Sequence, residues 1–210
     1  MIKQDENKQR LFTMLANMNK GLSSDKRLEI LYLLMQAPKT VEMIAQEINA
    51  STANTSRHLQ VLRQSHFVKT TKRGNHIIYS LADNDIATLI NLLIHIGENN
   101  LAEFRSLQEQ ANNDHNVEMI SLVQAKKHAG NYLILDVRPQ DEYSFGHVDG
   151  AMNIPYNILN KNLSKLPKDR PIIVYCRGKM CGITNQATQF LNQNGFNAVS
   201  LNNTWQEWKE

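Results

Sequence analysis

The chain has 210 residues, of which 41% are hydrophobic and 20% charged, with a formal net charge of +3 at pH 7. This length holds one large domain or two of about 100 residues each. No apolar run approaches the roughly 18 residues of a membrane helix, and the first residues do not resemble a signal peptide. Only 2 cysteines are present, too few for a disulfide framework, so we expect a cytoplasmic protein.

Charge is unevenly distributed along the chain. Residues 1–82 contain 12 Lys and Arg against 6 Asp and Glu, a net charge of +6. Residues 83–210 contain 11 against 14, a net charge of −3. The first part alone is therefore expected to meet a polyanion.

The apolar pattern of the first part predicts four helices. An amphipathic helix is expected over residues 5–20, and a second helix ends before Pro38. A third helix over 41–48 and a fourth over 52–65 are separated by a three-residue turn. Two short helices joined so tightly indicate a helix-turn-helix.

The fourth helix has a polar face suited to DNA. Thr55, Leu59 and Leu62 share its apolar face. The short polar side chains elsewhere suit base edges, and its arginines suit phosphates. A solvated helix face would show the same residue types, so this helix alone does not decide between the two interpretations.

A predicted β-hairpin favours DNA binding. Residues 67–71 and 76–81 alternate as strands, and Lys72 and Arg73 lie in the connection together with Gly-Asn. Such a hairpin suits a wing along the sugar-phosphate backbone. The residues expected to contact double-stranded DNA are Thr52, Asn54, Ser56, Arg57, His58, Gln60, Arg63, Lys72, Arg73 and Asn75.

Residues 20–82 resemble the ArsR-type winged-helix repressors, through Ser-Arg-His-Leu at 56–59, Leu-Arg at 62–63 and the wing. The resemblance implies a mainly α winged helix-turn-helix domain, placed at residues 1–110. It also implies a homodimer, formed through the first and last helices, on a palindromic operator. His66 replaces the usual Gly of the family, and a His can adopt the positive φ needed there.

The metal sites of that family are incomplete in this chain. Residues 41–48 contain no cysteine, so the Cys-x-Cys site is absent. His95 and Glu98 match half of the family's other site, but Ala82 and Asn84 occupy the partner positions. Two ligands do not complete a tetrahedral zinc site, so we expect no metal.

A single long helix is expected over residues 85–110, with an apolar stripe wide enough to suit burial in a dimer. Residues 111–116 are polar and unpatterned, as in a linker. Residues 117–210 alternate strands and helices, which predicts an α/β domain with a parallel sheet. The strands are expected at 132–137, 151–155, 172–175 and 198–201, and the helices at 121–129, 142–146, 183–195 and around Trp205 and Trp208.

The loop after strand 172–175 contains both cysteines. Cys176 follows the strand directly, Arg177 and Lys179 lie beside it, and a helix begins near Ile183. Positive charge and a helix N-terminus both lower a thiol pKa, so Cys176 is expected to be a nucleophile. The alternative is a buried structural cysteine. That alternative does not explain Cys181 in the same loop.

Residues 117–210 resemble the rhodanese domain. The similarity lies in Leu-Asp-Val-Arg at 135–138, Gly-His-Val-Asp-Gly-Ala at 146–151, Asn-Ile-Pro at 153–155 and Tyr-Cys-Arg-Gly at 175–178. The resemblance implies that Cys176 accepts a sulfane sulfur as a persulfide. The expected sulfur-binding loop is Arg177, Gly178, Lys179, Met180, Cys181 and Gly182, with Asp136, Arg138 and His147 in support. Asn202 and Asn203 replace the usual Gly-Gly, which we expect the structure to accommodate.

Residue 182 separates sulfur transfer from phosphoryl chemistry. The Cys-x5-Arg loop of phosphatases and arsenate reductases needs an arginine there to clamp the oxyanion, and this chain has Gly182. A persulfide needs only loop amides and nearby cations. Cys181 is either a resolving thiol that closes a disulfide with Cys176 or a residue packed under the helix start.

Three hypotheses follow from the two halves. The first, which we adopt, is a repressor whose rhodanese domain couples reactive sulfur, or thiol redox state, to operator binding. The second is a sulfurtransferase whose winged helix serves dimerisation, and the third is an idle rhodanese docking platform on a repressor. The expected partners are DNA and a small donor such as thiosulfate or polysulfide, with no cofactor and no membrane.

Overall fold

The computed structural model describes residues 2–113 and 116–209, and the chain divides after Ile96 into two compact units. Each unit is described here by itself. Within the described residues, no helix is long and apolar enough to cross a membrane. The expected domain limits at 110 and 117 stay predictions, and residues 114–115 of the expected linker lie outside the described part.

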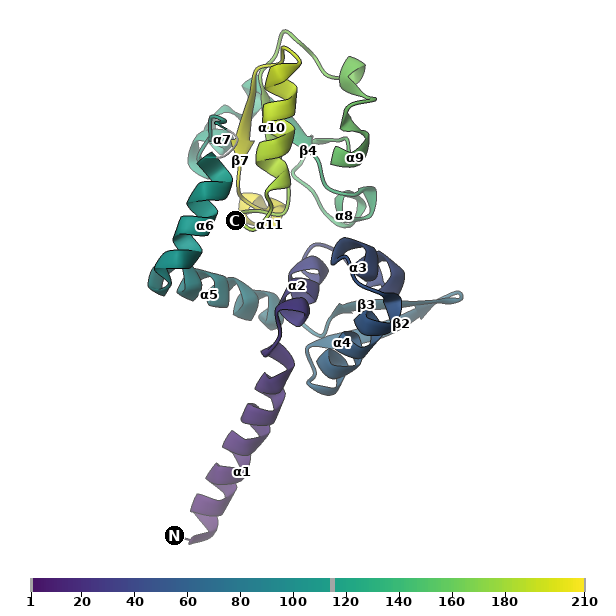
Figure 1. Cartoon of the computed structure of the whole chain (residues 1–210), viewed down its shortest axis with the longest axis vertical. Coiled ribbons are helices and arrows are strands. Elements are labelled where there is room, and N and C mark those ends of the chain that lie inside the picture. Colours follow the sequence, from purple (N-terminus) through teal and green to yellow (C-terminus); the bar gives the residue numbers. More distant parts are fainter. Residues whose placement is uncertain (1, 114–115, 210) are drawn as a thin grey trace. The chain divides into compact units, whose positions relative to one another are not determined.

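The first unit is built from the predicted helices (Figure 1). Their bounds are α1 Ile2–Asn19, α2 Asp25–Leu34, α3 Val41–Glu47 and α4 Thr52–Gln64, with a 3-10 turn at Lys20–Leu22. The helix-turn-helix is made by α3 and α4. The core of the first unit is apolar, with Ile30, Ile44 and Leu59 fully buried.

Side-chain caps fix where α3 and α4 begin. The Thr40 hydroxyl accepts a hydrogen bond from the Met43 amide at 3.4 Å, and the Ser51 hydroxyl accepts one from the Asn54 amide at 3.2 Å. Such caps satisfy amides that have no partner within the helix. Asn49 has a φ of 49°, a conformation that Asn tolerates better than most residues. The predicted helix-turn-helix is therefore present.

The wing is an antiparallel hairpin of β2 (Val68–Arg73) and β3 (His76–Leu81), and Figure 1 shows it projecting from the helices of its unit. A short strand, β1 (Lys39–Thr40), pairs with β3. Gly74 has a φ of +59°, so a tight turn follows Arg73 and the predicted wing cations lie on the end of β2. The positive φ expected for His66, which precedes the wing, is confirmed, because this residue has a φ of 62°.

The single helix expected over residues 85–110 is wrong. The structure has α5 (Asn84–Asn100) and α6 (Ala102–Asn113), with a break at Leu101. Arg105 Nη1 donates to the carbonyls of Glu98 and Asn99 at 2.8 and 2.9 Å. These bonds satisfy carbonyls at the end of α5, which explains why the chain can turn there. Residues 111–113 of the expected linker also belong to α6.

The second unit contains a four-stranded parallel sheet in the order β5-β4-β6-β7. The strands are β4 (Leu133–Asp136), β5 (Met152–Asn153), β6 (Ile172–Tyr175) and β7 (Ala198–Leu201). The helices are α7 (Leu122–His128), α8 (Gln140–Phe145), α9 (Tyr156–Leu159), α10 (Ile183–Gln193) and α11 (Trp205–Lys209), with 3-10 turns at Ala129–Asn131 and Leu163–Lys165.

Both faces of this sheet are covered. Ile172 and Val174 of β6 pack in one cluster with Ala187 of α10, and Ile173 and Tyr175 pack in a second cluster with α7. Alternate residues of a strand point to opposite faces, so a strand buried on both sides reads as a continuous apolar run. The predicted parallel α/β domain is therefore present.

Candidate functional site: the dithiol loop and the DNA-binding face

The dithiol loop, residues 176–182, connects the carboxyl end of β6 to the start of α10, where parallel sheets hold their ligands. Gly178 has a φ of +90° in this loop, and a Cβ there would lie 2.9 Å from the Thr204 methyl group. The position therefore needs glycine both for its backbone and for its space. Asn203 and Thr204 pass directly behind it.

The two thiols of the loop lie side by side. The Sγ atoms of Cys176 and Cys181 are 2.8 Å apart, and both cysteines are free. Cys176 is 1% exposed, whereas Cys181 is partly exposed. Two thiols in such contact can share one proton, because a thiolate on one sulfur accepts a hydrogen bond from the other.

The lowered thiol pKa belongs to Cys181 and not to Cys176, which corrects the expectation for the reduced loop. Burial raises the pKa of Cys176 well above its usual value, and the hydrogen bond to Cys181 adds to the rise. The same hydrogen bond lowers the pKa of Cys181 to about 6, helped by the amides of Arg177 and Ile183. Sequence reasoning counted the charges near Cys176 but had no measure of its burial.

Arg177 is committed to an ion pair inside the second unit. Its Nη2 lies 2.6 Å from Glu142 Oε1, and its Nε lies 3.0 Å from Oε2. Glu142 is fully buried and Arg177 is 8% exposed. A bidentate, desolvated pair fixes the guanidinium plane, so Arg177 anchors the loop to α8 while its charge still favours thiolates at both cysteines.

Asp136, Arg138 and Tyr175 form a buried cluster beneath the loop, each 0% exposed. Arg138 Nη2 lies 2.6 Å from Asp136 Oδ2, and the Tyr175 hydroxyl donates to the same oxygen at 2.7 Å. Burial raises the pKa of Tyr175 far above its usual value, and the Asp136 charge adds to this rise. The cluster fixes the ends of β4 and β6, directly before Cys176.

His147, the third residue expected to support the loop, and the pair Asn202 and Asn203 make contacts with residues other than the two cysteines. His147 is half-buried, stacks on Tyr143 with ring centroids 3.9 Å apart, and has its Nδ1 2.8 Å from the Tyr143 carbonyl. Asn203 Nδ2 donates to Glu207 Oε1 at 3.1 Å, and Asn202 Nδ2 lies 3.5 Å from the Met119 sulfur. The second unit thus accommodates asparagines in place of glycines.

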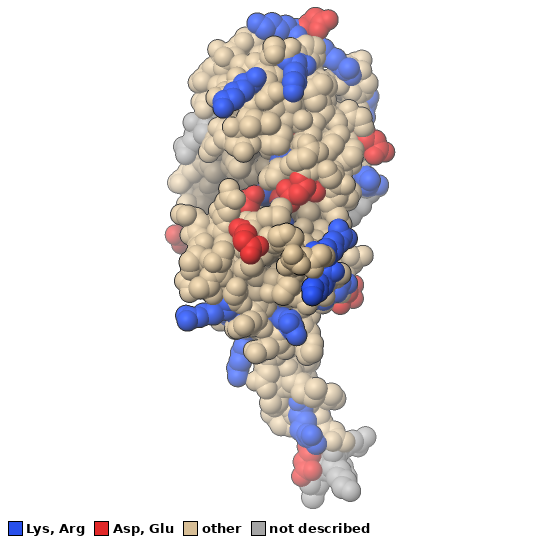
Figure 2. Space-filling model, turned by 90° about the vertical axis from the view of Figure 1, so that its right-hand side faces the viewer, with Lys and Arg blue, Asp and Glu red and all other residues tan. Residues whose placement is uncertain are grey.

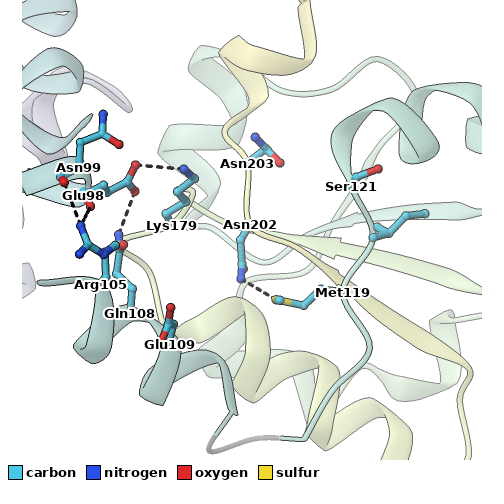
Figure 3. Close-up of a pocket in the computed structure, with 11 residues that line it drawn as sticks. Glu98, Asn99, Arg105, Gln108, Glu109, Met119, Ser121, Lys179, Asn202 and Asn203 are labelled. Atoms are coloured by element: carbon cyan, nitrogen blue, oxygen red, sulfur yellow. Dashed lines mark hydrogen bonds and ion pairs between the residues drawn. The ribbon is translucent and has the colours of Figure 1, made fainter. Parts of the chain in front are cut away.

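Lys179 of the dithiol loop borders a pocket of about 580 Å³ (Figure 3). Lys179 Nζ lies 3.2 Å from Oε2 of Glu98, at the end of α5. Gln108 Nε2 donates to the other Glu98 oxygen at 3.1 Å and lies 3.9 Å from the Met180 sulfur. Lys179 and Met180 are exposed, and Gly182 begins α10 as its N-cap.

The residues predicted to contact DNA all lie at the surface of the first unit. Ser56 and His58 are half-buried, and the other eight are exposed: Thr52, Asn54, Arg57, Gln60, Arg63, Lys72, Arg73 and Asn75. Thr55, Leu59 and Leu62 are buried, as expected for the opposite face of α4. On the face of the chain that Figure 2 shows, basic side chains lie among acidic and uncharged ones and not in one continuous patch.

The half-site for metal noted in the sequence is occupied by other interactions. Glu98 pairs with Lys179, and His95 is exposed. Across residues 2–113 and 116–209, no group of three or more His, Cys, Asp or Glu is placed to hold a metal ion.

Sequence reasoning missed the partners of the loop residues. Glu142 entered the sequence analysis only as the first residue of the expected helix 142–146, and nothing in the order of residues shows that it pairs with Arg177. Glu98 was considered only as a metal ligand. The one available signal was the charge type, since a carboxylate in a region that becomes buried needs a cationic partner.

The fold and the site define a winged-helix DNA-binding unit in one chain with a rhodanese-like unit. The profile described as "Bacterial regulatory protein, arsR family" matches residues 24–70, and the "Rhodanese-like domain" profile matches residues 119–210. The HTH-type transcriptional regulator Rv0324 of Mycobacterium tuberculosis is 30% identical over 210 residues, which is 100% of this chain and 93% of that protein. The chain belongs to the ArsR family of DNA-binding regulators and carries a rhodanese-like domain as its C-terminal part.

Two further similarities concern one part each. The thiosulfate sulfurtransferase GlpE of Shewanella oneidensis is 32% identical over 95 residues, covering 44% of this chain and 87% of that protein. The solution structure of the homodimeric winged helix-turn-helix domain of Mb0332 from Mycobacterium bovis is 30% identical, with a TM-score of 0.44, and covers 46% of this chain and 89% of that one.

Proposed function

We propose that this regulator is a repressor whose operator affinity responds to reactive sulfur at the dithiol loop. The observation that carries the proposal is the 2.8 Å separation of two free thiols on a loop of a DNA-binding regulator. A single structural cysteine would need no such neighbour. The sulfur chemistry is supported by the similarity to a thiosulfate sulfurtransferase over this part of the chain.

The first step places sulfur on Cys176. With one proton on the pair, Cys181 is the thiolate and Cys176 the thiol. Cys176 attacks the outer sulfur of thiosulfate while its proton passes to Cys181, and sulfite leaves with the electron pair of the broken S–S bond. The product is a Cys176 persulfide anion beside a Cys181 thiol. Loop amides and Arg177 are placed to stabilise that anion.

The second step uses Cys181 as the resolving thiol. The Cys181 sulfur bonds to the inner sulfur of the Cys176 persulfide, and the terminal sulfur leaves as hydrosulfide with the Cys181 proton. The two steps together convert one thiosulfate and the dithiol into sulfite, hydrosulfide and a Cys176–Cys181 disulfide. The disulfide differs from the reduced loop in charge and shape, because the thiolate is lost and a ring closes. The persulfide keeps one negative charge but moves it from Cys181 to Cys176 and adds a sulfur atom. Either state can therefore act as an effector.

The operator-binding form is proposed to be a homodimer. Exposed apolar side chains gather on two helices of the first unit: Leu11, Phe12, Met14 and Leu15 of α1, and Leu89, Leu92, Leu93 and Ile96 of α5. Exposed apolar surface of this kind typically marks an interaction site. A dimer would place two copies of α4 on a palindrome, with Arg57, Arg63, Lys72 and Arg73 on the phosphates.

Intact-protein mass spectrometry after brief exposure to thiosulfate tests the chemistry. Cys181→Ser should accumulate one added sulfur atom on Cys176, because the resolving thiol is missing. The unaltered chain should lose two hydrogen atoms instead, and Cys176→Ser should do neither. Sulfur on Cys181 of the Cys176→Ser variant, at the rate of the unaltered chain, would overturn the order of the two steps.

A further inference from the structure

An ion pair joins the dithiol loop to the last turn of α5. Lys179 lies between the two cysteines in sequence, and its Nζ is 3.2 Å from Glu98 Oε2. Figure 3 shows Glu98, Lys179 and Gln108 converging on one point. The Glu98 side chain is 16% exposed and that of Lys179 57%, so the carboxylate is the better-fixed partner.

The Glu98 carboxylate is itself fixed on both oxygens. While Oε2 faces Lys179, Oε1 accepts a hydrogen bond from Gln108 Nε2, which also lies 3.9 Å from the Met180 sulfur. Arg105 Nη1 donates a hydrogen bond to the Glu98 backbone carbonyl at 2.8 Å. Two adjacent loop residues, 179 and 180, therefore meet the α5–α6 corner through Glu98 and Gln108.

The same helix carries core residues of the first unit. Ile86 and Ile90, near the start of α5, are 5% and 3% exposed in that unit's core. Glu98 lies in the last turn of the continuous helix. A helix transmits displacement along its axis because its hydrogen bonds link every turn to the next.

We propose that Glu98 is a positioning residue that makes the last turn of α5 sensitive to the sulfur state of the dithiol loop. The product of the two proposed steps, a Cys176–Cys181 disulfide, closes residues 177–180 into a ring and so moves Lys179 from its position in the reduced loop. The ion pair with Glu98 then weakens and the end of α5 loosens. This inference rests on the proposed function for the identity of the effector.

The size of the effect follows from the kind of contact. Partly exposed ion pairs contribute little to the stability of the structure around them. Loss of this ion pair should therefore raise the equilibrium constant for local opening at the end of α5 by about twofold to fivefold. Coupling between two sites is reciprocal, so DNA affinity can change by no more than about the same factor for each loop through this contact. The proposal therefore predicts a graded response and not a complete loss of binding.

Hydrogen exchange of the amides in residues 97–104 of the full chain tests the proposal, with thiosulfate as the probe and intact mass to follow the loss of two hydrogen atoms from the dithiol. In the unaltered chain, thiosulfate should raise exchange about twofold to fivefold. Glu98→Gln should exchange fast without thiosulfate and change no further, although its dithiol is still oxidised to the disulfide. The matched control Glu109→Gln, an exposed carboxylate of α6, should behave as the unaltered chain.

A charge swap separates the ion pair from general damage to the corner. Glu98→Lys alone should exchange fast, and adding Lys179→Glu should restore slow exchange in the reduced chain. Equal exchange in Glu98→Gln and the unaltered chain would overturn the proposal, as would unchanged exchange after the disulfide has formed. A change in exchange without any change in DNA affinity would support Glu98 and overturn the proposed function instead. A dithiol that thiosulfate leaves unchanged in mass would overturn the proposed function and the sulfur-sensing part of this inference, and the Glu98 variants would then decide the positioning part.

Discussion

Cys176 and Cys181 place their Sγ atoms 2.8 Å apart, one sulfur buried and the other partly exposed. This contact makes the two thiols one titrating unit, so a pKa assigned to either depends on the other. In the proposed chemistry, the buried Cys176 accepts the sulfur and the more accessible Cys181 thiolate takes its proton. The predictions below follow from this contact and from the surfaces around it.

Alkylation of Cys181 should depend on pH with a midpoint of about 6. The pKa is low mainly because Cys176 donates a hydrogen bond to the thiolate, so Cys176→Ala should raise the midpoint toward the ordinary value of about 8.5. The measurement is the rate of iodoacetamide labelling, with Cys181→Ser as the control for labelling elsewhere. An unchanged midpoint in Cys176→Ala would show that the thiols do not share a proton.

Tyr175→Phe should lower the free energy of unfolding by about 1–3 kcal/mol. The substitution removes a hydrogen bond to the buried Asp136 carboxylate and leaves the Val148 amide without its acceptor. Thermal or urea unfolding measures the change. Tyr156→Phe, at a residue 36% exposed, is the matched control and should stay within about 0.5 kcal/mol. Equal stability of the two variants would mean that the buried cluster contributes nothing at Tyr175.

Arg57→Ala combined with Arg73→Ala should weaken DNA binding at all sequences alike. If both side chains neutralise phosphates, each protomer of the proposed dimer loses two contacts, so the slope of log Kd against log salt should fall by about 4. Fluorescence anisotropy over a salt series gives this slope. The double variant Lys126→Ala with Lys127→Ala removes the same charge from exposed residues of the rhodanese-like unit and should keep the original slope. Retained slope in the arginine variant would refute the phosphate assignment.

Leu93→Glu should convert the proposed dimer to a monomer and remove most operator binding. Leu93 is 43% exposed on α5, among other exposed apolar side chains, and a buried unpaired carboxylate is costly at an interface. Sedimentation gives the oligomeric state. Val123→Glu, at a residue 77% exposed in α7, is the matched control and should leave the state unchanged. A monomeric unaltered chain would contradict the dimer outright.

The sequence predicted the local elements better than the contacts between distant residues. The helix-turn-helix over residues 41–65 and the strand before Cys176 follow from patterns within a few residues. The break at Leu101 was missed because it depends on Arg105 reaching back to carbonyls of α5. The expected low pKa of the Cys176 thiol was also wrong, since Cys176 is buried in the same cluster as Val174 and Ala187, and burial raises its pKa. The ion pair of Arg177 with Glu142 joins residues that are distant in the sequence, so it cannot be predicted until the fold is known.

The most direct test of the central claim is the operator affinity of one sample of the full chain, measured before and after thiosulfate, with intact mass recorded at each point. The operator can be a duplex selected from random DNA by the reduced chain. The account predicts that Kd changes in step with modification of the loop and that Cys176→Ser abolishes both changes. A fully modified loop with an unaltered Kd would contradict the account and leave a sulfurtransferase joined to an indifferent winged helix.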